Sequence, residues 1–172
     1  RRSDRLVFCE KHPEAFAALK ARFARDRRVK TLDLDGWTAL GAFTPPPERR
    51  GLALVDPPYE ARDEFARLAK AFAAAHAKWS TGVYALWYPV KDRREADALW
   101  RSVRASGARS ALRLELAVAP TGEGGGLTRT GLVVVNPPFV LEAEAHVLLP
   151  ELARLLERSP GAGAHLIEAF EV

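Results

Sequence analysis

Short apolar runs alternate along the chain with longer segments in which apolar residues recur every three or four positions. The short runs predict β-strands at residues 5–10, 29–34, 51–55, 82–88, 111–118 and 131–135, with an edge strand at 165–172. The longer segments predict α-helices at residues 13–25, 37–43, 60–79, 92–106 and 141–157. This alternation is typical of an α/β fold with a mainly parallel sheet, and no linker or repeat divides the chain further.

Two of these predicted elements contain residues that interrupt the simple pattern. In the strand at 111–118, leucines alternate with the charged residues Arg113 and Glu115. Because side chains of a strand point alternately to its two faces, we expect one face of this strand to be covered less completely. The helix at 141–157 contains Pro150, which either kinks the helix or begins a second helical segment.

The tetrapeptide Asp56-Pro57-Pro58-Tyr59 directly follows the apolar strand at 51–55. Ligands of open α/β sheets bind beyond the carboxyl ends of the strands, so the tetrapeptide is predicted to lie at the site of chemistry. The prolines favour extended backbone and supply no N–H groups, so the Asp56 carboxylate and the Pro57 carbonyl form two fixed, converging acceptors. Such a pair can accept both hydrogens of an exocyclic amine and direct its lone pair at an electrophilic methyl group. Tyr59 offers a ring on which an extruded base can stack.

A purely structural interpretation of the same four residues is a strand end, a proline turn and a packed tyrosine. We favour the functional interpretation for Asp56 to Tyr59 because a strand precedes them and a helix follows. The similar segment Asn136-Pro137-Pro138-Phe139 is predicted to be structural, because it lies near the C-terminus, far from the strands that end in acids.

Acidic residues also end the first two predicted strands, at Glu10 and at Asp35-Gly36. In nucleotide-binding α/β folds, an acid at such a strand end binds ribose hydroxyls about 20 residues after a Gly-rich turn. Only nine residues precede Glu10, so this chain has no room for that turn. The sequence also contains no methionine and begins at Arg1, and we therefore expect it to be the later part of a longer protein.

Composition limits the remaining possibilities. The 172 residues correspond to one domain or a large part of one, and no apolar run reaches the ~18 residues of a membrane span. The single cysteine, Cys9, excludes an internal disulfide and a Cys-based metal cluster, which fits the cytoplasm. The formal net charge of +4 permits a polyanionic partner, and the basic segment at 91–94 follows a strand end at the predicted catalytic edge.

Five segments together resemble a known family. They are LVFCEKHPEAF at 6–16, RGLALVDPPYE at 50–60, TGVYALWYPV at 81–90, LELAVAP at 114–120 and LTRTGLVVVNPPF at 127–139. With them the chain resembles, nearly end to end, the bacterial 23S ribosomal RNA adenine-N6 methyltransferases of the RlmJ type. DPPY alone is typical of any amino-methyltransferase, whereas ALWYPV combined with the late NPPF is more specific.

The resemblance implies the class I methyltransferase fold, with seven strands of which one is antiparallel, and S-adenosylmethionine as cofactor. It implies that Glu10 binds the cofactor ribose, that Asp35 and Gly36 contact its adenine, and that Asp56 is catalytic and lies beside its methionine end. It also implies that Tyr59 stacks on the target base. The family's first strand, its cofactor loop and a small helical insertion have no counterpart here, so residues 1–172 are expected to form the C-terminal, larger part of a single methyltransferase domain.

The function expected from these features is N6-methylation of a flipped adenine in 23S rRNA by a cytoplasmic monomer that uses no metal and contacts no membrane. One alternative with the same chemistry is a DNA adenine-N6 methyltransferase. An alternative of a different class is a basic RNA-binding module without catalytic activity, which the absence of the cofactor loop would produce.

Overall fold

The computed structural model describes residues 4–48, 50–120 and 126–172. Contacts between residues divide the chain into two compact units, Arg1–Thr44 and Pro45–Val172. Each unit has its own sheet, and each is described by itself.

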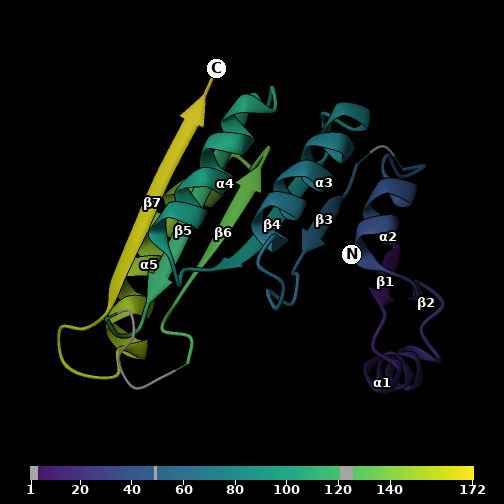
Figure 1. The fold of residues 1–172 in the computed structure, drawn as a ribbon, viewed down its shortest axis with the longest axis horizontal. Helices are drawn as coiled ribbons and strands as arrows, with labels where there is room; N and C mark the ends of the chain where they lie inside the picture. Colours follow the sequence, from purple (N-terminus) through teal and green to yellow (C-terminus); the bar gives the residue numbers. More distant parts are fainter. Residues whose placement is uncertain (1–3, 49, 121–125) are drawn as a thin grey trace. The chain divides into compact units, whose positions relative to one another are not determined.

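The smaller unit contains two parallel strands and two helices, β1 (Leu6–Glu10), α1 (Pro13–Phe23), β2 (Val29–Asp33) and α2 (Gly36–Phe43) (Figure 1). Pro13 occupies the first turn of α1, where its missing N–H costs nothing. The register pairs Leu6 with Val29 and Glu10 with Asp33. Both strands therefore present their carboxyl ends at one edge of this small sheet, with Glu10 as the last residue of β1 and Asp35 just after β2.

The larger unit contains a five-stranded sheet in the order β3-β4-β6-β5-β7. Its elements in chain order are β3 (Leu52–Val55), α3 (Glu64–Lys78), β4 (Val83–Pro89), α4 (Arg93–Ala105), β5 (Ser110–Ala117), β6 (Arg129–Val135), α5 (Leu141–Leu156) and β7 (Ala164–Glu171). Strands β3, β4 and β5 run in one direction, and β6 and β7 run in the other. Strands β3, β4 and β5 thus share one direction, as expected of a mainly parallel sheet. Three of the four pairings in this sheet are nevertheless antiparallel, because β6 lies between β4 and β5 and β7 lies beside β5.

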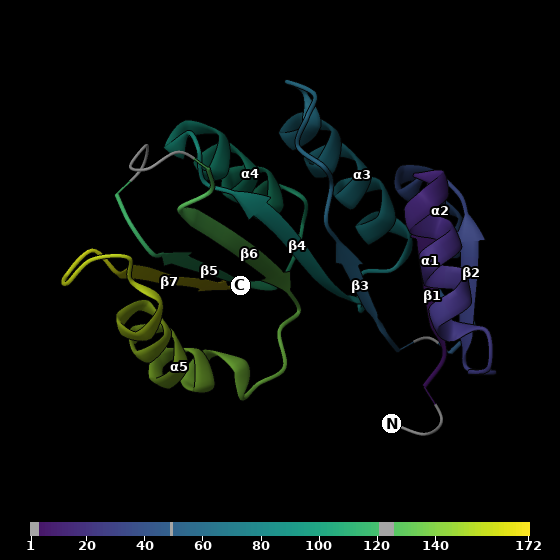
Figure 2. The same ribbon diagram turned by 90° about the horizontal axis from the view of Figure 1, so that it is seen from below.

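Helices cover both faces of the five-stranded sheet: α3 and α4 lie on one face and α5 on the other (Figures 1 and 2). The α3 and α4 face is closely packed, because these helices carry an apolar stripe at helical spacing. Its fully buried residues include Leu68, Phe72, Tyr84, Leu86, Tyr88, Leu99 and Val103. The expected edge strand near the C-terminus is confirmed as β7, and Pro150 lies inside a continuous α5.

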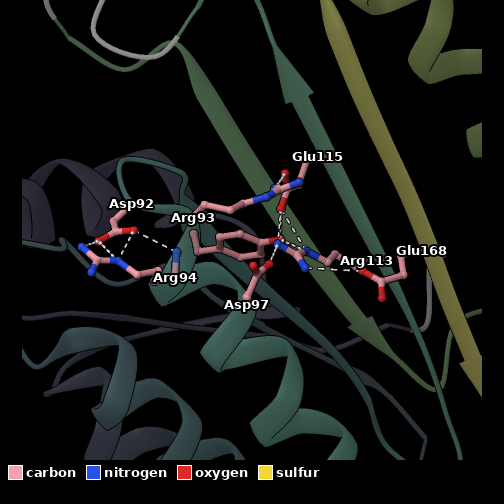
Figure 3. A network of polar contacts seen from close by, with 8 residues as sticks. Asp92, Arg93, Arg94, Asp97, Arg113, Glu115 and Glu168 are labelled. Atoms are coloured by element: carbon pink, nitrogen blue, oxygen red, sulfur yellow. Dashed lines mark hydrogen bonds and ion pairs between the residues drawn. The ribbon is translucent and has the colours of Figure 1, made fainter.

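The expectation of a poorly covered charged face on β5 is wrong. Arg113 and Glu115 are 3% and 2% exposed. The Arg113 Nε donates to Glu115 Oε1 at 2.9 Å and to the Tyr88 hydroxyl at 3.1 Å, and that hydroxyl donates to Glu115 Oε1 at 3.1 Å. Arg93 pairs with the other oxygen of Glu115 (Figure 3). Burial of these charges is possible because each is paired inside the fold.

Two further carboxylates extend this network from neighbouring elements. Asp97 of α4 lies 2.8 Å from Arg113 Nη2, and Glu168 of β7 lies 3.4 Å from Arg113 Nη1 (Figure 3). Both carboxylates are partly exposed, at 39% and 40% of their side-chain surface. The network therefore joins β4, α4, β5 and β7 through one buried guanidinium.

Apolar side chains are exposed on β3 and on α5. Within the described part of the chain β3 pairs only with β4, and its Leu52 and Leu54 are 64% and 68% exposed. On α5, Val147 and Leu155 are 73% and 60% exposed. None of the described helices is both long and apolar enough to cross a bilayer.

Candidate functional site

The backbone after β3 holds Asp56 and Pro57 at the carboxyl end of the strand, as the sequence predicts. Asp56 is exposed, whereas Pro57 is buried and fixes the start of the loop. Among the described residues, none donates a hydrogen bond to the Asp56 carboxylate, and partial burial raises its pKa above the ordinary value. A carboxylate that is directed by a proline and not engaged internally is available to accept hydrogen bonds from a ligand.

Tyr59 is held in place by its hydroxyl and by two rings. The hydroxyl donates to the Trp87 carbonyl at 2.7 Å, just beyond Leu86, the last β4 residue that pairs with β3. The ring centroid lies 4.9 Å from that of Phe65 and 5.8 Å from that of Trp87. The backbone of Tyr59 adopts a φ of 53°, a strained conformation for a bulky residue. Tyr59 is thus anchored to β4 through its hydroxyl and its ring, although it lies beyond the residues of β3 that pair with β4.

The electrostatic surroundings of Tyr59 are negative. Burial raises the pKa of its hydroxyl, and the nearby carboxylates of Asp56 and Glu64 raise that pKa further. Glu64, in the first turn of α3, is only 4% exposed and has an oxygen, Oε2, without a hydrogen-bond partner among the described residues. Sequence reasoning did not single out Glu64, because an acid in the first turn of a helix is common and stabilises the helix dipole.

The acids of the smaller unit lie together at one edge of its sheet. Glu10 Oε1 accepts a hydrogen bond from the backbone of His12 at 2.7 Å. Asp35 Oδ1 caps α2 by accepting from the backbone N–H groups of Trp37 and Thr38, both at 3.1 Å. Nothing lies within 4 Å of the position that a Cβ would take on the adjacent Gly36. Asp35 therefore has a structural role as an N-cap, and the space beside Gly36 is open.

The basic segment at 91–94 is largely engaged in internal contacts. Arg93 pairs with the buried Glu115, and Arg94 pairs with Asp92, the N-cap of α4, at 3.0 Å. Figure 3 shows both arginines turned to these carboxylates. The expected contact with nucleic acid would therefore depend mainly on Lys91, which is exposed.

Asn136 has the structural role that the sequence predicts. Its side-chain amide donates to the carbonyls of Ser80 at 2.9 Å and Gly82 at 2.7 Å, which ties the end of β6 to the start of β4. Its φ of 51° lies in the left-handed region, which asparagine tolerates better than most residues. Phe139, at the end of the same segment, is 96% exposed.

The sequence of the chain matches a known protein family. Residues 1–167 match the family model described as "Ribosomal RNA large subunit methyltransferase D, RlmJ". The chain belongs to this family. The resemblance inferred from its motifs is therefore confirmed.

Two curated members of the RlmJ family show how much of such a protein the chain represents. The Ribosomal RNA large subunit methyltransferase J of Haemophilus influenzae is 38% identical over 168 residues, which are 98% of this chain and 59% of that protein. The protein of the same name from Escherichia coli is 38% identical over 152 residues, which are 88% of this chain and 54% of that protein. The chain thus spans little more than half the length of these relatives.

Solved structures agree with this assignment of the fold. A protein of Legionella pneumophila superposes with a TM-score of 0.88 at 34% identity, covering 98% of this chain and 61% of its own. A probable spermidine synthase of Corynebacterium glutamicum has a TM-score of 0.60 at 20% identity, covering 94% and 57%. The second likeness concerns the fold alone. The predicted α/β class I methyltransferase fold is confirmed.

Proposed function

We propose that the protein is an rRNA methyltransferase that transfers a methyl group from S-adenosylmethionine to N6 of a flipped adenine in 23S rRNA. The observation that carries this proposal is the Asp56-Pro57-Pro58-Tyr59 loop. Its carboxylate is not engaged inside the described structure, and its tyrosine is fastened to the Trp87 carbonyl. Membership of the RlmJ family supports the same activity.

Orientation of the amine is the proposed contribution of Asp56 and Pro57. The N6 amine of adenine is a poor nucleophile because its lone pair is delocalised into the ring. When the Asp56 carboxylate and the Pro57 carbonyl accept its two hydrogens, the nitrogen can become pyramidal and direct its lone pair in line with the methyl group. Even with its pKa raised by partial burial, the Asp56 carboxylate is far too weak a base to deprotonate the neutral amine first. The proton therefore leaves only after transfer, from the positively charged N6 to the Asp56 carboxylate or to water. Positioning is then the main catalytic term.

Tyr59 is proposed to stack on the extruded adenine. Its anchoring to β4 through the hydroxyl and the rings of Phe65 and Trp87 fixes the ring before the base arrives. A ring that is already ordered loses little entropy on binding, and stacking contributes about 1–3 kcal/mol per base.

Three residues of the smaller unit are proposed to hold the cofactor. Within the described residues only one carboxylate oxygen of Glu10 is engaged, by the His12 backbone, so its other oxygen can accept from the ribose hydroxyls. The open space beside Gly36 suits the close approach of an adenine ring, with Asp35 next to it at the start of α2. When bound, S-adenosylmethionine supplies the electrophilic methyl group, and Asp56 is proposed to lie beside its methionine end. In this proposal both units belong to a single methyltransferase domain, of which the chain forms the C-terminal, larger part.

A methyl-transfer assay on three substrates tests the proposal. Naked 23S rRNA, assembled large subunits and duplex DNA are incubated with the protein and labelled S-adenosylmethionine, and the products are digested to nucleosides. We expect N6-methyladenosine from at least one of the rRNA substrates. Methylation confined to duplex DNA would favour the DNA methyltransferase. RNA binding without saturable cofactor binding would identify an inactive RNA-binding module.

A further inference from the structure

A pocket of about 230 Å³ lies against Tyr59 and the residues that follow it. Its walls come from the segment that follows the loop and from the end of β4 with the start of α4. The lining residues are Tyr59, Glu60, Ala61, Arg62, Phe65, Pro89, Lys91 and Glu95. Pockets for drug-sized ligands measure roughly 300–1,000 Å³, so this smaller pocket would enclose part of a single nucleotide and cannot hold an extended ligand.

Two cations of the pocket are available to a ligand. Arg62 and Lys91 are both exposed, and no carboxylate of the described residues pairs with either. They differ in this from Arg93 and Arg94, which are engaged with Glu115 and Asp92. Arg62 and Lys91 come from different loops, so an anionic group that contacts both must lie between the two side chains.

The other lining residues favour a ligand with polar and apolar groups over a simple anion. Phe65 and Pro89 provide apolar surface, whereas Glu60 and Glu95 bring two carboxylates. A free anion gains little from a site with two positive and two negative charges. A ligand that carries a phosphate, a sugar with donor hydroxyls and a flat ring can satisfy all three kinds of surface at once.

We propose that this pocket is a second nucleotide subsite, which binds the nucleotide next to the target adenine along the RNA. Lys91 and Arg62 contact its phosphate, and Glu60 and Glu95 accept hydrogen bonds from its sugar hydroxyls or from base amino groups. The inference rests on the proposed function, because Tyr59 forms a wall of the pocket and is also the proposed stacking residue. It gives the enzyme a contact to the RNA outside the flipped base.

The end of β4 is rigid enough to serve such a subsite. Arg93, two residues after Lys91, is fixed by its ion pair with Glu115, and Tyr88, next to Pro89, is fully buried and hydrogen-bonded to the same carboxylate. The loop between them is thus fastened at both ends to one buried group. Lys91 is therefore presented on an ordered backbone.

Binding of a single-stranded, adenine-containing RNA oligonucleotide at several KCl concentrations tests the subsite. For single strands, log K falls with log salt by about 0.7 for each phosphate contact. We expect Lys91→Gln and Arg62→Gln each to weaken binding roughly fivefold at low salt and to reduce the slope by about 0.7. The matched control, Arg94→Gln, removes an exposed charge that is already paired with Asp92 and should leave slope and affinity close to those of the wild type.

The carboxylates provide a second readout that a general charge effect would not give. If Glu95 accepts a hydrogen bond from the ligand, Glu95→Ala should weaken binding to RNA although it raises the net positive charge. Unchanged or tighter binding by Glu95→Ala would show that only long-range charge operates at the pocket, and would overturn the subsite.

Methylation kinetics distinguish a failure of the subsite from a failure of the proposed function. Lys91→Gln should raise KM for RNA with little change in kcat, because the phosphate contact is made equally before and during transfer. If the wild type methylates RNA but Lys91→Gln and Arg62→Gln behave like Arg94→Gln, the subsite alone is overturned. A wild type that neither binds nor methylates RNA would overturn the proposed function as well.

Discussion

The ring of Tyr88 crosses directly over Gly131 of the neighbouring strand. Tyr88 pairs with Gly131, which pairs in turn with Glu115, so the three residues form one row across β4, β6 and β5. A Cβ on Gly131 would lie 2.2 Å from the Tyr88 ring. The glycine therefore lets the tyrosine hydroxyl reach past a whole strand to Glu115, where it donates at 3.1 Å.

Gly131→Ala is expected to be strongly destabilising. The methyl group would displace the Tyr88 ring, which would both overpack the face and break buried hydrogen bonds, at a cost of about 2–4 kcal/mol. Chemical denaturation measures the loss in free energy of unfolding. Gly41→Ala, in α2, is the matched control: nothing lies within 4 Å of its Cβ position, and alanine favours a helix, so stability should be unchanged or higher.

Glu115→Ala and Glu168→Ala should differ sharply although both remove a carboxylate from Arg113. Glu115 is 2% exposed and also holds Tyr88 and Arg93, so its loss leaves a buried guanidinium poorly compensated and should cost about 3–5 kcal/mol. Glu168 is partly exposed at 3.4 Å, and its loss should cost below about 1 kcal/mol. Similar unfolding free energies for the two variants would show that the network is not centred on Glu115.

The stability of the protein should fall on acidification through His76. This side chain is 5% exposed, packs against the rings of Phe72 and Tyr84, and burial lowers its pKa. Below the ordinary histidine pKa of about 6.5, the unfolded chain therefore binds a proton at this position more readily than the folded protein does. The stabilising contribution is therefore complete above pH ~6.5 and is lost as pH falls below it.

Thermal unfolding between about pH 7.5 and 5.5 measures this effect, because that range brackets the ordinary pKa of histidine. His76→Phe should flatten the dependence of Tm on pH over the range. His146→Gln removes an exposed histidine and should leave the dependence as in the wild type. An unchanged profile in His76→Phe would assign the acid sensitivity to other groups.

Two substitutions of Tyr59 separate its ring from its hydroxyl. Tyr59→Phe keeps the ring and loses the hydrogen bond to the Trp87 carbonyl, so stability should fall by about 1 kcal/mol and methylation should remain largely intact. Tyr59→Ala loses the ring and should weaken RNA binding and turnover by an order of magnitude, as expected for loss of one stacked base at ~1–3 kcal/mol. Equal losses in both variants would argue against stacking.

Local pattern predicted most of the fold. Each strand and helix appears within a few residues of its predicted bounds, because apolar periodicity, Pro13 and the strand-end acids act over short distances. The burial of Arg113 and Glu115 was missed, because alternation along one strand shows which residues share a face but not what covers that face. Their partners, Tyr88, Arg93 and Asp97, come from β4 and α4.

The candidate site was also predictable only in part. The placement of Asp56 and Pro57 follows from the strand and the prolines, whereas the positive φ of Tyr59 and its bond to Trp87 depend on β4, 28 residues further along the chain. Asp35 was expected to contact the cofactor, and its engagement as the N-cap of α2 became visible only with the helix in place. The pocket beside Tyr59 has no signature in the sequence, because its lining comes from two segments about 30 residues apart, 59–65 and 89–95.

The most direct test of the account is the rate of N6-methyladenosine formation in rRNA by Asp56→Ala, with circular dichroism as a check on folding. Asp56 is exposed, so the variant should fold normally. We expect it to bind RNA but to produce no N6-methyladenosine, while Asp56→Asn, whose amide oxygen can still accept one hydrogen, should retain a small part of the activity. Turnover near the wild-type rate in a folded Asp56→Ala variant would contradict the central claim that the Asp56 carboxylate orients the target amine.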